Sequence, residues 1–194
     1  MSVYLFFKKY FIFAGKGLAL YLHGKWMSPN AASIGSLFVI FPMFYVIGKY
    51  IEPGWMFAGA ITLAILLKLI LNAVDGIIAR ERGESTRLWM ALNVGTDIGP
   101  DMYIISMILT VYKIPSITIQ ILISIIWIYL LGEFLFILLF QKQNLFFWKD
   151  LRTVFYIFLA GVLYFGFDPI TLIYFYSVIA TIHVAGFFLP KYRT

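Results

Sequence analysis

Two short stretches of this chain combine the residues that are best suited to chemistry. The stretch LNAVDGIIAR ends a long apolar run and carries Asn72, Asp75 and Arg80. The stretch NVGTDIGPD follows soon after and adds Asp97 and Asp101. The chain contains only 9 acidic residues in 194, so three carboxylates at the edge of an oily segment call for an explanation.

Helical spacing places these groups on two facing stripes. Residues three or four apart share one face of a helix, so Asn72 and Asp75 lie together, and Asp97 and Asp101 form a second pair. A hairpin between the two segments would bring Asp75 opposite the second pair. Three carboxylates in a low-dielectric pocket require cations. Oxygen donors, in a chain without cysteine, favour Mg²⁺ or Mn²⁺, and Arg80 is suitably placed for a phosphate.

A purely structural interpretation is the alternative. Acids within a membrane can pair with basic residues or conduct ions, and acids at a helix end can be solvated at the interface. One acid would favour that interpretation. Three acids at this spacing, together with Arg80, favour a binding site.

Composition indicates an all-α integral membrane protein. Hydrophobic residues make up 62% of the chain and charged residues 12%, whereas soluble domains are about 45–50% apolar and 25% charged. A helix needs about 20 apolar residues to cross a bilayer. Six continuous segments are predicted to span the membrane: Ala31–Gly48, Gly54–Ala79, Leu92–Tyr112, Pro115–Phe140, Leu151–Phe167 and Pro169–Leu189.

Charge predicts how these spans are oriented. Basic residues concentrate before the first span, after the second, around the fourth loop and at the end of the chain, while the alternate loops hold only Lys49 and Lys113. The positive-inside rule then places both termini in the cytoplasm. The net charge of +6 is a topology signal and a source of affinity for anionic lipid, so no nucleic-acid partner is expected.

The N-terminal segment differs from the spans. Residues 1–28 are apolar but interrupted by lysines, which predicts an amphipathic helix lying in the membrane interface rather than a signal peptide. Ser28 or Asn30 is expected to cap the first span. We therefore expect a single domain over residues 1–194, with a six-helix bundle over residues 31–189.

The acidic residues also resemble a known signature. The run from Asp75 to Arg80 reads D-G-x2-A-R, and Asp97 to Asp101 reads D-x3-D. This pattern is similar to that of the CDP-alcohol phosphotransferases, membrane enzymes with six spans. The chain departs from it at Asn72, where the family usually has an additional Asp, and in a longer spacer that ends at Asn93 instead of Gly. It looks like a divergent bacterial subgroup of that family.

The resemblance implies a reaction and a set of roles. Family members transfer a substituted phosphate from a CDP-alcohol, commonly CDP-diacylglycerol, to a polar alcohol and release CMP. The resemblance implies two bound ions, Mg²⁺ or Mn²⁺. By this resemblance, the metal ligands would be Asp75, Asp97 and Asp101, with Asn72 in the place of the remaining ligand. The general base would be Asp101. The groups that bind the CDP moiety would be Gly76, Ala79, Arg80 and Asn30.

Further polar residues carry weaker signals. The loop residues Arg82, Arg87 and Arg152 could hold an acceptor phosphate, although loop basic residues often only follow the inside rule. Lys68 and Glu133 lie at similar depth in two spans and are expected to pair. The alternative is that Lys68 pairs with an acid near the site.

Three other functions stay open at this point. An intramembrane prenyltransferase would use similar metal chemistry, but usually on a longer chain with more spans. A relative disabled by Asn72 would bind CDP-lipid without turnover, and a small transporter would carry polar residues along a whole path. The resemblance also implies a homodimer in the bacterial inner membrane, with its active site near the cytoplasmic face. The sequence leaves the acceptor alcohol open.

Overall fold

The computed structural model describes residues 3–24, 27–84, 86–113 and 146–187, together with single positions between 117 and 131. All regular structure in these residues is helical, which agrees with the predicted all-α class. The helices are α1 (Val3–Gly24), α2 (Pro29–Tyr50), α3 (Trp55–Arg82), α4 (Arg87–Val111), α6 (Phe146–Tyr164) and α7 (Ile170–Phe187).

Local capping fixes where the central helices begin and end. Ser28 caps α2, as expected, by accepting a hydrogen bond from the Ala31 amide at 3.1 Å. Thr86 caps α4 in the same way through the Trp89 amide at 3.1 Å. Gly83 ends α3 in the left-handed region, at a φ of 65°, where glycine carries no steric penalty. A short turn between Gly83 and Thr86 therefore reverses the chain from α3 into α4.

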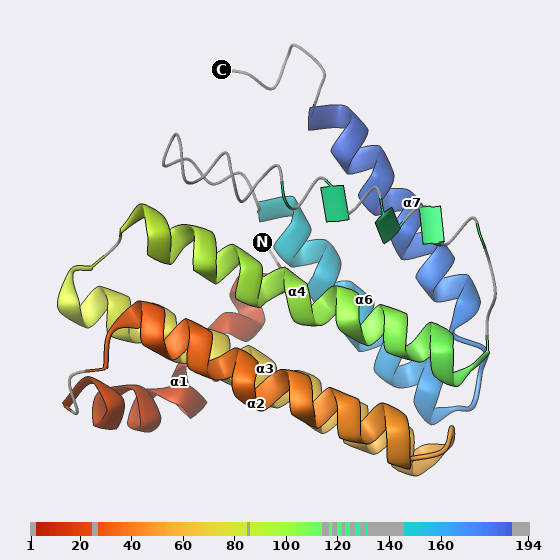
Figure 1. Ribbon diagram of the computed structural model, residues 1–194, viewed down its shortest axis with the longest axis horizontal. Coiled ribbons are helices and arrows are strands. Elements are labelled where there is room, and N and C mark those ends of the chain that lie inside the picture. The colour runs from red at the N-terminus through yellow and green to blue at the C-terminus, as the bar shows by residue number, and fades with distance from the viewer. Residues whose placement is uncertain are drawn as a thin grey trace.

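The helices α2, α3 and α4 lie side by side along much of the bundle (Figure 1). The helix α2 packs closely along both α3 and α4. At one point α2 and α4 come very near, since a Cβ atom added to Gly48 would lie 2.5 Å from the Met107 side chain. By contrast, α3 and α4 make few close backbone contacts with each other. Longer side chains therefore fill the space between α3 and α4.

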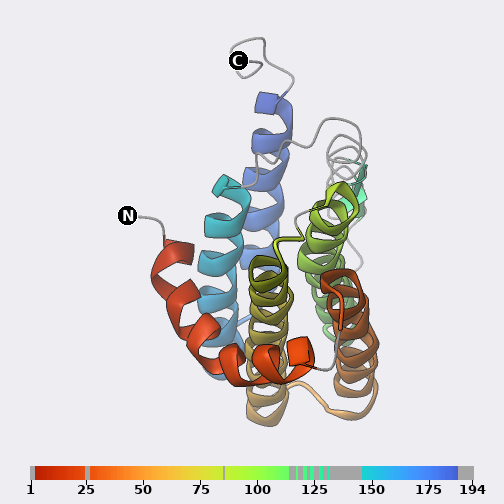
Figure 2. The same ribbon diagram turned by 90° about the vertical axis from the view of Figure 1, so that its left-hand side faces the viewer.

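The N-terminal helix crosses the bundle instead of extending it (Figure 2). It packs on the C-terminal third of α3, where Ala19 lies in a buried cluster with Val74, Ile77 and Ile78. Close approach depends on Gly15, since an added Cβ would lie 3.1 Å from the Val74 side chain. The helix α1 thus supports the part of α3 that carries the D-G-x2-A-R stretch.

The last two described helices complete the core. One, α6, packs against α3, α1 and α7. Its Phe155 and Leu159 join a buried cluster with Phe44 of α2, Phe57 of α3 and Ile108 of α4. Side chains from several helices therefore share one apolar interior around the polar groups of α3 and α4.

Among the described residues, two helices are long and apolar enough to cross a membrane: α2, with a mean hydropathy of 1.9, and α3, with 2.1. The outer surface is also rich in large apolar side chains, such as Phe13 with 83% of its surface exposed. Exposed apolar area on this scale is typical of a surface that meets lipid or a partner. The predicted fourth span falls mostly outside the described residues.

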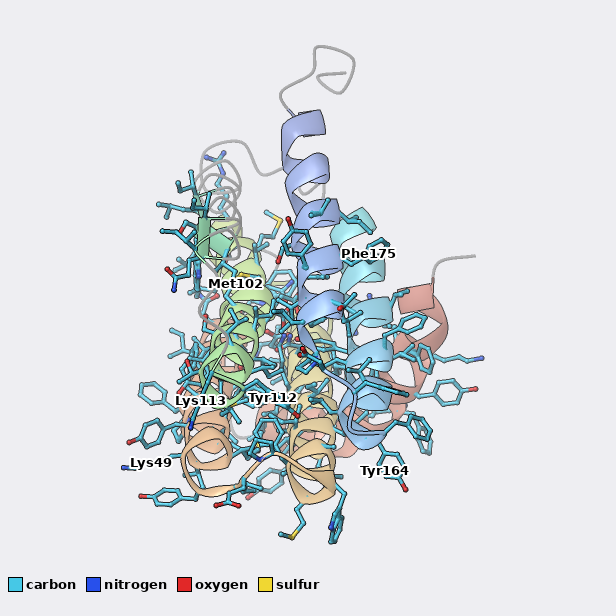
Figure 3. All side chains as sticks on the ribbon, turned by 90° about the vertical axis from the view of Figure 1, so that its right-hand side faces the viewer. Lys49, Met102, Tyr112, Lys113, Tyr164 and Phe175 are labelled. Carbon is cyan, nitrogen blue, oxygen red and sulfur yellow. The ribbon has the colours of Figure 1, made fainter. Side chains whose placement is uncertain are left out.

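The described loops lie at two opposite ends of the bundle. Lys49 and Lys113 lie toward the same end of the bundle as Tyr164 (Figure 3). The more basic loop between α3 and α4 lies at the other end, because α3 runs back from that first end. The charge asymmetry between successive loops is therefore an asymmetry between the two ends of the molecule.

Candidate active site

The polar groups of α3 and α4 meet in matched pairs. Asn72 donates a hydrogen bond from Nδ2 to Asp97 Oδ1 at 2.5 Å. One turn away, the Lys68 ammonium forms an ion pair with the Asp101 carboxylate. Because the two helices are antiparallel, the four-residue step from Lys68 to Asn72 matches the step from Asp101 back to Asp97. The bond from Asn72 to Asp97 confirms that the two stripes face each other at this point. The predicted position of Asp75 opposite Asp97 and Asp101 stays a prediction.

Asp75 connects this pair of helices to a third. Its Oδ2 accepts a hydrogen bond from Ser33 Oγ of α2 at 2.5 Å. The Asp75 side chain is 1% exposed, so this charge-assisted bond lies in a dry environment. Ser33 in turn receives a hydrogen bond on its carbonyl from Ser36 at 2.7 Å. The helix α2 therefore supplies a polar support that the acidic motif alone did not indicate.

Lys68 is the centre of a second network. Besides Asp101, its ammonium donates to the Asp97 carbonyl oxygen at 2.6 Å and to the Tyr156 hydroxyl at 3.1 Å. The Tyr156 hydroxyl also donates to Asp101. An ammonium group has three donors, and these three acceptors match that number. Lys68 is fully buried, at 0% exposure, so the contacts stabilise a charge that water does not reach.

The site gathers several buried ionisable groups. Asp97 and Asp101 are 4% and 2% exposed, and with Asp75 they give three buried carboxylates near the buried ammonium of Lys68. Buried carboxylates are stabilised by cations or by taking up protons. The arrangement is therefore suited to holding positive charge.

Hard oxygen donors of this kind fit Mg²⁺ or Mn²⁺. Within the described part of the chain, no group of three His, Asp or Glu side chains is arranged as ligands of a single ion. Asn72 precedes Asp75 by three residues on α3, and it is hydrogen-bonded to Asp97 of α4. Asp75, Asp97 and the amide oxygen of Asn72 are thus oxygen donors of the chemical type that such ions bind.

No known protein settles the identity of this site. The chain matches no family model, no curated protein and no solved structure. The resemblance to the CDP-alcohol phosphotransferases therefore depends on the residues themselves.

The proposed CDP-binding residues lie around the basic end of α3. Gly76 is half-buried and Ala79 is buried, while Arg80 is exposed. A Cβ atom at Gly76 would lie 3.6 Å from the Arg80 guanidinium, which is ordinary van der Waals contact, so Gly76 and Arg80 are neighbours on α3. Asn30 lies one turn before Ser33 on α2, which places it toward the same end of the bundle as Ala79.

The three arginines that were predicted to hold an acceptor phosphate have different surroundings. Arg82 is half-buried and lies 3.6 Å from the Glu84 carboxylate, whereas Arg87 is exposed at the first position of α4. The Arg152 side chain and the whole of Glu133 lie outside the described residues. The pairing of Lys68 with Glu133 thus stays a prediction, while the alternative, a salt bridge from Lys68 to an acid near the site, is confirmed by Asp101.

Two residues of the site were missed from the sequence. Ser33 is one of several hydroxyl residues on apolar helices, and Tyr156 is one of 13 tyrosines. Tyr156 does more than pack in the interior, because its hydroxyl binds both Lys68 and Asp101. Neither residue has a spacing that would connect it to the acidic motif.

Proposed function

We propose that this chain is a CDP-alcohol phosphotransferase of the membrane. It would transfer a substituted phosphate, such as phosphatidyl, from a CDP-alcohol to a polar alcohol acceptor and release CMP. The observation that carries the proposal is the group of three buried carboxylates, with Asn72 bonded to Asp97, at the junction of α2, α3 and α4. Oxygen donors gathered in an apolar interior suit a substrate with a charged diphosphate.

The reaction assigns a task to each side of the site. The acceptor hydroxyl oxygen attacks the phosphorus that bears the donor alcohol, the bond from that phosphorus to the bridging oxygen breaks, and its electron pair leaves with CMP. Asp101 takes the acceptor proton, as a general base. Lys68 and Tyr156 hold the Asp101 carboxylate in one orientation through their hydrogen bonds.

The remaining residues bind and position the donor. Asp75, Asp97 and Asn72 would hold Mg²⁺ or Mn²⁺, which supplies charge neutralisation for the diphosphate when bound. Ser33 would fix the Asp75 carboxylate through its hydrogen bond. Arg80, which is exposed at the end of α3, would reach the phosphates of the nucleotide from the aqueous side.

The chemistry of the substrates indicates where in the membrane the reaction would take place. A CDP head group is soluble and a diacylglycerol tail is not, so the reaction belongs where headgroups meet hydrocarbon. The acidic residues lie within a few turns of the basic end of α3, which supports such a location. We propose a multi-pass protein of the bacterial inner membrane with this end at the cytoplasmic face, acting as a homodimer as the resemblance implies.

One observation favours a second candidate. The ion pair between Lys68 and Asp101 ties up the proposed base, and Asn72 replaces a carboxylate. A relative that binds CDP-lipid without turning it over would have both features. This candidate predicts nucleotide binding without CMP release.

A measurement of CMP release distinguishes the active transferase from the inactive relative. Purified protein would be incubated in detergent with CDP-diacylglycerol, Mn²⁺ and a pool of polar alcohols. We expect release that requires both metal and acceptor and is lost in Asp101→Asn. The matched control is Glu52→Gln, which makes the same carboxylate-to-amide change at an exposed loop position and should keep full activity. Binding of CDP-lipid without release under any acceptor would select the inactive relative.

A further inference from the structure

We infer that the end of the bundle away from Arg80 carries a second binding site, for the headgroup of an anionic phospholipid that has free hydroxyl groups. The site is a cavity of about 640 Å³ at the end of α4, a size that suits a small ligand. Its polar lining consists of Ser106, Thr110, Lys113, Gln120 and Ser124. These residues have no task in the proposed transfer reaction, so the inference does not depend on that function.

The spacing of the polar residues gathers them on one side of each segment. Ser106, Thr110 and Lys113 follow one another at i, i+4 and i+7, which is a single stripe at the end of α4. Gln120 and Ser124 are both helical and are four residues apart, so they also share a face. The cavity is therefore lined by two polar stripes in a chain whose helices are otherwise strongly apolar.

The cavity is separate from the acidic residues. Lys113 lies toward the same end of the bundle as Lys49 and Tyr164 (Figure 3). From Asp101 to Val111, the last residue of α4, the helix rises about 15 Å, which is half of a hydrocarbon core. In a bilayer the cavity would thus face the leaflet opposite to the one that the proposed active site faces.

The hydroxyl groups of the cavity have already used their protons. Ser106 donates to the Met102 carbonyl at 2.8 Å, and Thr110 donates to the Ser106 carbonyl at 2.9 Å. Ser124 donates in the same way to the Gln120 carbonyl at 2.8 Å. The lone pairs of these three oxygens are left to accept. They suit a ligand that donates hydrogen bonds, such as a headgroup with free hydroxyl groups.

Lys113 supplies the positive charge. It is exposed and forms no ion pair within the described part of the chain. Its φ of 53° lies in the left-handed region, where the other described residues with positive φ are glycines. Glycine would take this conformation without strain, so a lysine here indicates a use for its side chain. An ammonium group beside a polar cavity suits the phosphate of a headgroup.

The apolar part of the lining selects a lipid over a free phosphate. Leu109 and Ile123 line the same cavity and are nearly buried, at 9% and 8% exposure. A phospholipid combines an anion and hydroxyl groups with an apolar part, and each of these has a counterpart in the cavity. Inorganic phosphate would leave the apolar lining unused.

The first test compares lipids on the unaltered protein. Native mass spectrometry from detergent would give dissociation constants for phosphatidylglycerol, phosphatidylmethanol and phosphatidylcholine with the same acyl chains. The first has the negative charge and the hydroxyl groups, the second has only the charge, and the third has neither. We expect phosphatidylglycerol to bind about tenfold more tightly than phosphatidylcholine, with phosphatidylmethanol between them. Equal affinity for phosphatidylglycerol and either of the other two lipids would overturn the inference.

The second test removes the charge of the cavity. Lys113→Gln should weaken phosphatidylglycerol binding about tenfold, the effect of one charge-assisted hydrogen bond. Lys49→Gln is the matched control, because it removes an exposed charge at the same end, and it should keep the affinity. Lys113→Gly should weaken binding as much as Lys113→Gln without lowering the midpoint of thermal unfolding, because glycine fits the left-handed turn.

Two results would contradict this placement of the lipid. Unchanged affinity in both Lys113 variants would leave Lys113 as a residue of the turn only. Loss of affinity in Arg80→Gln, with no loss in Lys113→Gln, would place the lipid at the opposite end of the bundle.

Discussion

Removing Lys68 is expected to destabilise the fold through the charge it leaves behind. In Lys68→Met the Asp101 carboxylate, 2% exposed, loses its counter-charge, and breaking a buried pair in this way costs about 3–5 kcal/mol. Asp101→Asn leaves the buried ammonium without that carboxylate and should cost a similar amount. Removing both charges together should cost less than either single change.

The size of that difference can be worked out. The combined variant loses both ions but keeps a buried amide whose hydrogen bonds are incomplete, at a cost of about 1–3 kcal/mol. The two single changes sum to about 6–10 kcal/mol. The coupling energy of the double-mutant cycle should therefore be at least about 3 kcal/mol, at or above the top of the range for residues in contact.

The assay is equilibrium unfolding in mixed micelles, with the free energy of unfolding obtained for all four proteins in metal-free buffer. Lys49→Met is the control, because Lys49 is exposed and its change should lie within about 0.5 kcal/mol. Additive costs, within about 0.5 kcal/mol, would show that Lys68 and Asp101 are not energetically paired and would refute the account of the site given above.

Three further substitutions test the supports of the site. Ser33→Ala removes a hydrogen bond to a buried carboxylate and should lower the free energy of unfolding by about 1.5–3 kcal/mol. Ser36→Ala loses only a bond to a neutral carbonyl and should lower it by about 1 kcal/mol. Equal losses in the two variants would argue against a charged Asp75. Thr86→Ala removes the cap of α4 and should cost about 1 kcal/mol, seen as faster amide hydrogen exchange in its first turn; unchanged exchange there would contradict the capping role. Gly15→Leu should reduce the protection of α1 amides from hydrogen exchange, because its Cβ would lie 3.3 Å from a backbone oxygen of α3. Gly17→Leu is the control and should leave that protection unchanged, because the space around Gly17 is open. Equal protection in the two variants would contradict the packing of α1 on α3.

Hydropathy located the helices but not their ends. The expected span Ala31–Gly48 lies inside α2, and Gly54–Ala79 falls one residue short of lying inside α3. The third span was expected to begin at Leu92, whereas α4 begins at Arg87. The difference arises because apolar runs mark the part of a helix that meets lipid, while Thr86 sets the start by capping.

Helical periodicity predicted the facing of α3 and α4 but not the role of α2. Asn72 and Asp75 share a stripe, yet a three-residue step turns the helix by about 300°, which leaves them about 60° apart on its circumference. That angle is enough for Asn72 to bond α4 and for Asp75 to bond α2. Spacing within one helix cannot show which neighbour each side of a stripe will meet.

The partner of Lys68 was undecided from the sequence for a similar reason. Depth estimates placed Lys68 beside both Glu133 and the acids of the site, and only the pairing of α3 with α4 distinguishes them. Tyr156 was invisible because its link to Lys68 spans 88 residues and belongs to no local pattern. Long-range contacts of this kind are set by how helices pack, which composition and periodicity do not encode.

The separation of these partners along the chain has a consequence for biosynthesis. When α3 leaves the ribosome, its Lys68 has no counter-charge, because Asp101 is 33 residues further on and Tyr156 is 88. An α3 entering a bilayer alone would carry an exposed ammonium into hydrocarbon, at a cost of about 2.5–3.5 kcal/mol on insertion scales. Entry of α3 and α4 as one hairpin avoids that cost, since the ion pair forms before either helix meets lipid on that face. The short turn from Gly83 to Thr86 would allow such paired entry, so we expect α3 and α4 to enter a bilayer together.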